Sequence, residues 1–157
     1  MKIHSRHLTI LPKLYINFFT NERSIQAHFQ SNHRRNTRST GGLIAIMDEE
    51  GSCRSVYCHH DMYPSHACVV LPEHYATREA LLALGVLSTL GCSPAECNAY
   101  FRDRGEELRE PTHWSDRWVL AREAFDRFWA NYCYLFMDGE WFCSDGGGWT
   151  PVVGWLE

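Results

Sequence analysis

Residues 57–64, with the sequence YCHHDMYP, hold the residue types that thiol chemistry requires. Cys58, His59 and Asp61 supply a nucleophile, a base and an acid that could orient the base, so a hydrolase can be written from them. Neighbouring residues of a strand point to opposite faces, however, so Cys58 and His59 are expected to project apart unless the strand ends between them. The favoured interpretation is structural: Tyr57, His59 and Asp61 share one side of a strand end, where Asp61 accepts hydrogen bonds from turn amides. The whole candidate motif is Tyr57, Cys58, His59, Asp61, Tyr63 and Pro64.

A metal site is the second chemistry that this region could support. Potential ligands crowd into a short stretch, namely Cys58, His59, His60, Asp61, His66, Cys68 and His74. Zinc sites commonly present two close ligand pairs, and neither a CxxC nor an HxxxH pair occurs in this stretch. We therefore expect no metal and no cofactor. A small metal- or thiol-dependent enzyme centred on Cys58, His59 and Asp61, with His66 or Cys68, is the main alternative.

The cysteines indicate a reducing compartment. Their number is seven, which is odd, and no small-residue cleavage site follows the mildly apolar stretch at residues 8–19, so no secretory signal is expected. Free thiols rather than a disulfide framework are then expected. The sequence therefore favours the cytoplasm.

Charge divides the chain near residue 38. Residues 1–38 carry seven Lys or Arg against one Glu, a net +6, whereas the remaining residues carry 8 basic and 18 acidic groups, a net −10. Nucleic acid binding requires a basic surface, so only the N-terminal arm could bind it. Residues 1–36 are expected to be a poorly ordered basic extension, and residues 37–157 a single domain. No apolar run is long enough to cross a membrane, and no membrane partner is expected.

Alternating apolar residues and turn signals predict two β-hairpins. The first joins residues 43–47 to 52–58 through an acidic turn, and the second joins 132–136 to 140–143 through Asp138 and Gly139. A final edge strand is expected within 149–155, because Pro151 confines that segment to the border of a sheet. Because hairpins rather than crossover helices join the strands, an α+β fold with a mainly antiparallel sheet is predicted.

Two or three helices are expected on one face of this sheet. The first occupies residues 65–75 and is interrupted near Pro72, and a short second one over 78–84 ends at a left-handed Gly85. The clearest helix signal begins at Ser115, and its apolar stripe is Trp118, Ala121, Phe125 and Phe128. Residues 87–91 are expected to close a turn, and residues 102–111 to form a solvated loop.

Several motifs resemble a family of small uncharacterised proteins of tailed phages and prophages. They are TRS at 37–39, YCHHDMYP at 57–64, HY at 74–75, LALG at 82–85 and YLFMDGEWF at 134–142, spread over about residues 37–143. Two positions depart from the family pattern: Met62 stands where the pattern has Gly, and His60 where it usually has Trp. Gly permits positive φ, so Met62 predicts either strain or a different turn. The resemblance implies a phage or prophage accessory protein, but no activity.

The tryptophans provide the remaining clue to function. Four of them, Trp114, Trp141, Trp149 and Trp155, are candidate interface residues, because Trp is enriched at protein interfaces, although core packing is the simpler explanation for each. An acidic domain with surplus Trp fits a module that docks on a basic partner. We therefore expect a non-enzymatic module that binds a host protein of unknown identity. A further alternative is an acidic inhibitor of a host DNA-binding protein, whose carboxylates imitate a phosphate surface.

Overall fold

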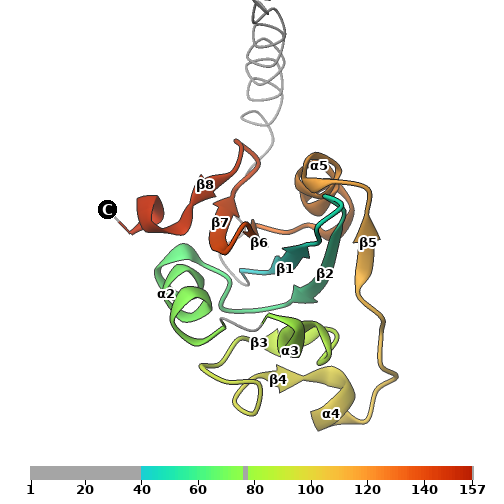
Figure 1. The fold of residues 1–157 in the computed structure, drawn as a ribbon. Coiled ribbons are helices and arrows are strands. Elements are labelled where there is room, and N and C mark those ends of the chain that lie inside the picture. Colours follow the sequence, from blue (N-terminus) through green and yellow to red (C-terminus); the bar gives the residue numbers. More distant parts are fainter. Residues whose placement is uncertain (1–39, 76–77, 157) are drawn as a thin grey trace, which may run out of the picture.

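The computed structural model describes residues 40–75 and 78–156, and its centre is one mixed β-sheet. The strands are β1 (Gly42–Met47), β2 (Cys53–Cys58), β3 (Leu87–Thr89), β4 (Asn98–Ala99), β5 (Thr112–Trp114), β6 (Tyr132–Met137), β7 (Glu140–Ser144) and β8 (Thr150–Pro151). Their order is β4-β3-β2-β1-β6-β7-β8, and β5 also pairs with β2 (Figure 1). The expected N-terminal extension, residues 1–36, lies outside the described residues.

Both predicted hairpins are present. β1 and β2 pair antiparallel, and at their turn the Asp48 carboxylate accepts backbone hydrogen bonds from Glu50 and Ser52. β6 and β7 also pair antiparallel, and Asp138 and Gly139 at their turn both have positive φ, 51° and 84°. Two successive positive φ values are typical of the turn that matches the twist of a tight hairpin.

A parallel pairing that the sequence did not predict joins the two hairpins. β1 lies beside β6 in register, with Ile44 opposite Tyr134 and Ile46 opposite Phe136. The two strands that meet here are the middle ones of the sheet, and their residues are buried on both faces. This explains why LIAI in β1 and CYLF in β6 read as continuous apolar runs rather than as alternating ones.

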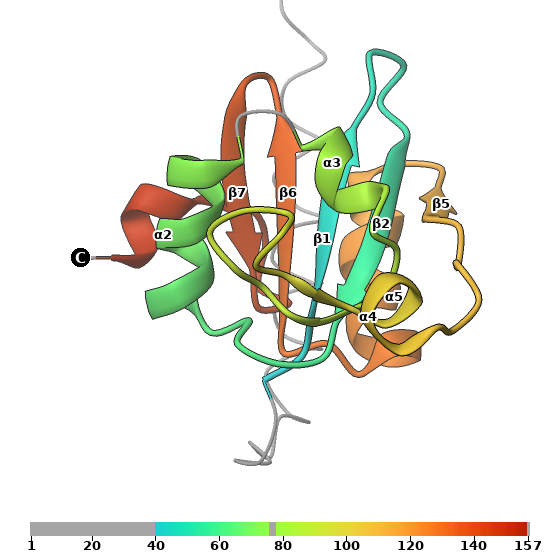
Figure 2. The same ribbon diagram turned by 90° about the horizontal axis from the view of Figure 1, so that it is seen from below.

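Helices cover both faces of the sheet. On one face, Ile44 and Ile46 pack in a core with α2 (Pro64–His74) and α3 (Glu79–Leu82). On the other, Leu43 and Ala45 pack with α5 (Arg117–Phe128), as Figure 2 shows. The α+β class and the mainly antiparallel sheet are confirmed. The expectation that the helices share one face is wrong, because strands that are apolar on both sides need a cover on each.

The helices differ from expectation in detail. α2 continues through Pro72 and ends at His74 instead of being interrupted. α5 is capped by Asp116 rather than Ser115, since the Asp116 carboxylate accepts hydrogen bonds from the backbone N–H of Trp118 and Val119 at 2.8 and 2.9 Å. Its buried side is formed by Leu120, Ala124 and Phe125. The buried side therefore shares only Phe125 with the apolar stripe that the sequence predicted.

Short elements replace several predicted turns and loops. Residues 87–91 hold β3 rather than a turn, and α4 (Tyr100–Arg104) occupies the start of the predicted loop at 102–111. The C-terminal edge strand is only β8, followed by a 3₁₀ turn, Val152–Trp155. Gly85 has the predicted left-handed conformation, with φ of 66°. No helix in the described part of the chain is long and apolar enough to span a membrane.

Leu135 on β6 tests the role of the central strands. Its side chain is fully buried, so Leu135→Ala should lower the free energy of unfolding by about 2–5 kcal/mol, because a cavity is left in the core facing α5. Urea denaturation measures the change. Leu156→Ala is the matched control, since Leu156 is 50% exposed and its truncation should change stability by less than about 0.5 kcal/mol. Equal effects of the two substitutions would show that the central strands are not the main support.

Candidate functional site

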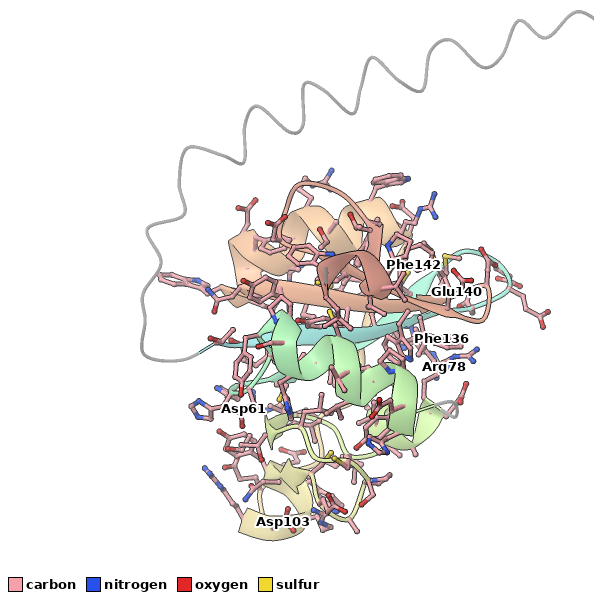
Figure 3. The ribbon with its side chains drawn as sticks, turned by 90° about the vertical axis from the view of Figure 1, so that its left-hand side faces the viewer. Asp61, Arg78, Asp103, Phe136, Glu140 and Phe142 are labelled. Atoms are coloured by element: carbon pink, nitrogen blue, oxygen red, sulfur yellow. The ribbon has the colours of Figure 1, made fainter. Side chains whose placement is uncertain are left out.

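The turn after β2 depends on an unusual backbone conformation at Asp61. Its φ is 65°, in the left-handed region that Asp tolerates better than most residues. Met62, where the family pattern has Gly, is fully buried, and its backbone N–H donates to the carbonyl of Thr40. The positive φ thus falls one residue earlier than the family pattern suggests. No hydrogen bond joins the Asp61 carboxylate to the residues described here, so the expected bracing by turn amides is absent there. Figure 3 places Asp61 near the start of α2.

Cys58 and His59 lie on different sides of the strand end. Cys58 is fully buried, and its thiol donates to the carbonyl of His60 at 3.3 Å. Burial raises the pKa of the Cys58 thiol to about 12, so the nucleophilic thiolate is scarce at neutral pH. His59 is exposed. β2 ends between the two residues, and they are nonetheless separated, because the thiol lies in the core and the imidazole at the surface.

His59 belongs to a continuous series of ring contacts, which we call the aromatic row. The row consists of Trp114, Phe128, Tyr57, His59 and Tyr100, with centroid separations of 5.7, 6.3, 4.8 and 5.2 Å in that order. The guanidinium of Arg104 lies over the Tyr100 ring, 4.3 Å from its centroid. The row starts in the core beneath α5, crosses the end of β2 and reaches the surface at α4. Ring contacts of this kind fix the orientation of the imidazole.

A hollow of about 210 Å³ opens beside His59. Its walls include Tyr100, Phe101, Glu106 and Arg109. Burial lowers the pKa of His59, and His60, Arg104 and Arg109 lower it further, while Glu106 acts in the opposite direction. The imidazole is therefore neutral at pH 7, which is the form that accepts a proton or a hydrogen bond.

The potential metal ligands do not converge. Within residues 40–75 and 78–156, no three His, Cys, Asp or Glu side chains gather closely enough to hold one ion. A ring nitrogen of His66 lies 3.0 Å from the carbonyl oxygen of Leu90, and His74 lies 3.7 Å from Glu73 on the surface. Cys68 is on the buried side of α2. These residues are close in sequence, but the end of β2 and the turns of α2 direct their side chains to different places.

The four tryptophans proposed for an interface are not the exposed ones. Trp114 and Trp141 are each 5% exposed, because they occupy inward positions of β5 and β7, so the interface prediction is wrong for both. The Trp114 indole N–H donates to the Ser55 hydroxyl at 2.8 Å. Trp149 and Trp155 are half-buried, and the Trp149 indole N–H donates to the carbonyl of Arg117.

Trp129, which sequence reasoning missed, is the most exposed large apolar residue of the described chain, at 83%. It directly follows α5 and has φ of 57°, in the left-handed region where Gly is the usual residue after a helix. The Ala130 backbone N–H donates to the Ala124 carbonyl across this residue. The backbone conformation costs about 1 kcal/mol for a residue with a Cβ, and the described fold does not bury the indole. The sequence did contain one signal for the unusual conformation of Trp129: no Gly, the usual residue after a helix, follows the apolar positions of this helix.

The pH dependence of stability tests the position of His59. Because its pKa is lowered below the value of 6.5 in the unfolded chain, the unfolded chain binds the proton more readily, and this contribution to stability is lost as the pH falls through and below 6.5. Urea denaturation between about pH 7.5 and 5 should therefore show a smaller loss of stability for His59→Gln than for the wild type. His74→Gln, at an exposed position, is the control. If the His59 variant lost as much stability as the wild type over this pH range, the position of His59 described here would be contradicted.

Thiol labelling tests the burial of Cys58. All seven cysteines lie in the described residues, and Cys92 is the exposed one. A disulfide reagent such as DTNB should therefore label one thiol rapidly in the native protein, and all seven after unfolding. Cys92→Ser should remove the rapid phase. Rapid labelling of Cys58 in that variant would instead support the hypothesis of a thiol-dependent enzyme.

Comparison with known proteins adds no relative. No protein-family model, curated protein or solved structure matches this chain. The resemblance to small phage and prophage proteins therefore stays a prediction from the motif residues. The function has to be argued from the surface geometry described above.

Proposed function

We propose that this protein is a phage or prophage accessory protein that binds a protein of the host in the host cytoplasm and catalyses no reaction. Trp129 carries the proposal. Its indole is 83% exposed and its backbone is in a conformation that a residue with a Cβ adopts only at a cost. Neither feature benefits the described fold, and both are explained if the indole is buried by a partner. Strained, exposed residues of this kind are typical of contact sites.

The aromatic row includes the residue before Trp129 in the chain, Phe128, and it contains residue types that are common at interfaces. Trp129 adjoins Phe128 of the aromatic row, and the row leads to His59, Tyr100 and the 47% exposed Phe101. We assign to the proposed docking surface the exposed residues His59, Phe101, Arg104 and Trp129 and the half-buried Tyr100. Trp, Tyr and Arg are the residue types that most often dominate binding energy at interfaces.

The charges near the docking surface favour a basic partner. Residues 101–110 are all exposed and carry three Arg against four acidic residues. Arg102 and Asp103 pair with one another at 2.7 Å, but Glu106 and Glu107 make no ion pair with the described residues. Together with the net −10 of residues 39–157, these carboxylates should attract and orient a basic protein surface.

Two alternatives retain support from particular observations. The neutral imidazole of His59 beside a hollow favours an enzyme in which His59 is a general base, although the buried Cys58 weakens a thiol mechanism. The 18 carboxylates favour an inhibitor of a host DNA-binding protein. The latter is a special case of the proposed function, because its partner would also be basic.

Affinity capture with Trp129 variants tests the proposed function. Immobilised full-length protein should retain one stoichiometric partner from host lysate, and Trp129→Gly should lose it. The same variant should be as stable as the wild type or up to about 1 kcal/mol more stable in urea denaturation, because Gly adopts positive φ without strain. A structural residue would behave in the opposite way, losing stability on truncation.

Matched controls make the capture decisive. Val153→Ala truncates another exposed apolar residue, 69% exposed and outside the docking surface, and should retain the partner. Competition of the captured partner by duplex DNA would identify the acidic inhibitor among the possible modes. Failure of the wild type to retain any partner, or equal retention by Trp129→Gly, would contradict the proposal.

A further inference from the structure

A second hollow, which shares Arg109 with the hollow beside His59, lies on the face of the sheet that carries α3. Its volume is about 300 Å³, at the lower end of the range for small-molecule sites. It is enclosed by α3, by the paired strands β2 and β5, and by the chain that leads into β5. Figure 2 shows α3 lying over β2, with the segment from α4 to β5 passing along the outer side.

Groups of both charges line this hollow without neutralising one another. Arg54 and Arg109 supply guanidinium groups, and Glu79 and Glu110 supply carboxylates. Among the described residues, no ion pair within 4.0 Å joins either arginine to either glutamate; Glu79 instead lies 3.7 Å from Arg78. The two arginines also have no side-chain hydrogen bond to a described residue. Arg54, Arg109 and Glu110 are therefore available to a ligand, and Glu79 is held only by an ion pair at the surface.

Sheet register holds the basic groups together. Arg54 on β2 lies directly opposite His113 on β5 in the antiparallel pair, so the two side chains project from the same face. Both side chains line the hollow, so Arg54 is held at the wall that β2 and β5 form. The planar guanidinium matches a carboxylate in geometry as well as in charge.

The opposite wall is fixed by a close backbone approach at Gly85. A Cβ at this position would lie 3.0 Å from Leu108 Cδ1 and 3.1 Å from the carbonyl oxygen of Arg109, and the φ of +66° also favours Gly. The segment that carries Arg109 is therefore held against the end of α3. Leu82, Leu108 and Pro111 give the hollow an apolar part. The site is thus formed before any ligand arrives.

From this arrangement we infer that the hollow binds a small zwitterion, an α-amino acid with an apolar side chain. Its carboxylate lies between Arg54 and Arg109, its ammonium group at Glu79 and Glu110, and its side chain against Leu82 and Leu108. The net −10 of residues 39–157 repels a simple anion over long distances, whereas a molecule of zero net charge does not meet this penalty. The field of the whole domain therefore favours a zwitterion over a carboxylic acid.

Titration of the full-length protein with L-leucine and two analogues tests this site. 4-Methylpentanoate lacks the ammonium group, and 3-methylbutylamine lacks the carboxylate. Amide shifts of Gly85, Leu108 and His113 should saturate with L-leucine, and each analogue should bind at least about tenfold more weakly. Equal binding of leucine and one analogue, or no saturable shift, would overturn the inference.

Charge-neutralising variants assign the two ends of the ligand. Arg54→Gln should reduce the advantage of leucine over 3-methylbutylamine, and Glu79→Gln its advantage over 4-methylpentanoate, since each variant lacks one of the two charged side chains that hold that end of the ligand. Arg122→Gln, which removes an exposed arginine of α5 outside the hollow, should leave both advantages unchanged. Loss of leucine binding in all three variants alike would indicate a general charge effect and contradict the site. None of these outcomes depends on Trp129, so they are independent of the capture experiment.

Discussion

The parallel pairing of β1 with β6 is the constraint on which the rest of the structure depends. It joins two hairpins that come from distant parts of the chain, and an isolated hairpin has little stability in water. Once paired, the two strands are central and apolar on both sides. The domain then needs a helix on each face, which α2 and α5 provide.

The environment of each residue at the end of β2 depends on these two cores. Alternate positions of β2 serve the two cores, so Cys58 enters the core beneath α2 and α3, while Tyr57 faces the α5 side and contacts Phe128. His59, the first residue beyond the strand, then continues the aromatic row to α4. A motif that looks like a nucleophile followed by a base is thus divided between the interior and the surface. The surface part, rather than the thiol, is available for interactions.

Local sequence patterns predicted where turns and helix ends occur, but they did not predict which elements pack against one another. Asp138 and Gly139 identified a hairpin turn, and Gly85 a left-handed helix end, because both signals depend on backbone conformation within a few residues. Trp118 and Trp141 show the limit of such patterns. Trp118 was placed on the buried stripe of α5 but is 43% exposed, and Trp141 was placed at an interface but is 5% exposed. Which face of an element is covered depends on elements remote in sequence.

The sequence by itself determined the fold class, both hairpins and the acidity of the domain, because these follow from alternation, turn residues and charge counts. Only the tertiary structure decided that β1 lies beside β6, that Trp129 is exposed after α5, and that Arg54, Arg109 and Glu79 line one hollow. The physical reason is that pairing and burial are set by contacts between segments far apart in the chain. A local sequence pattern does not show which strand pairs with which, or which side of an element another element covers.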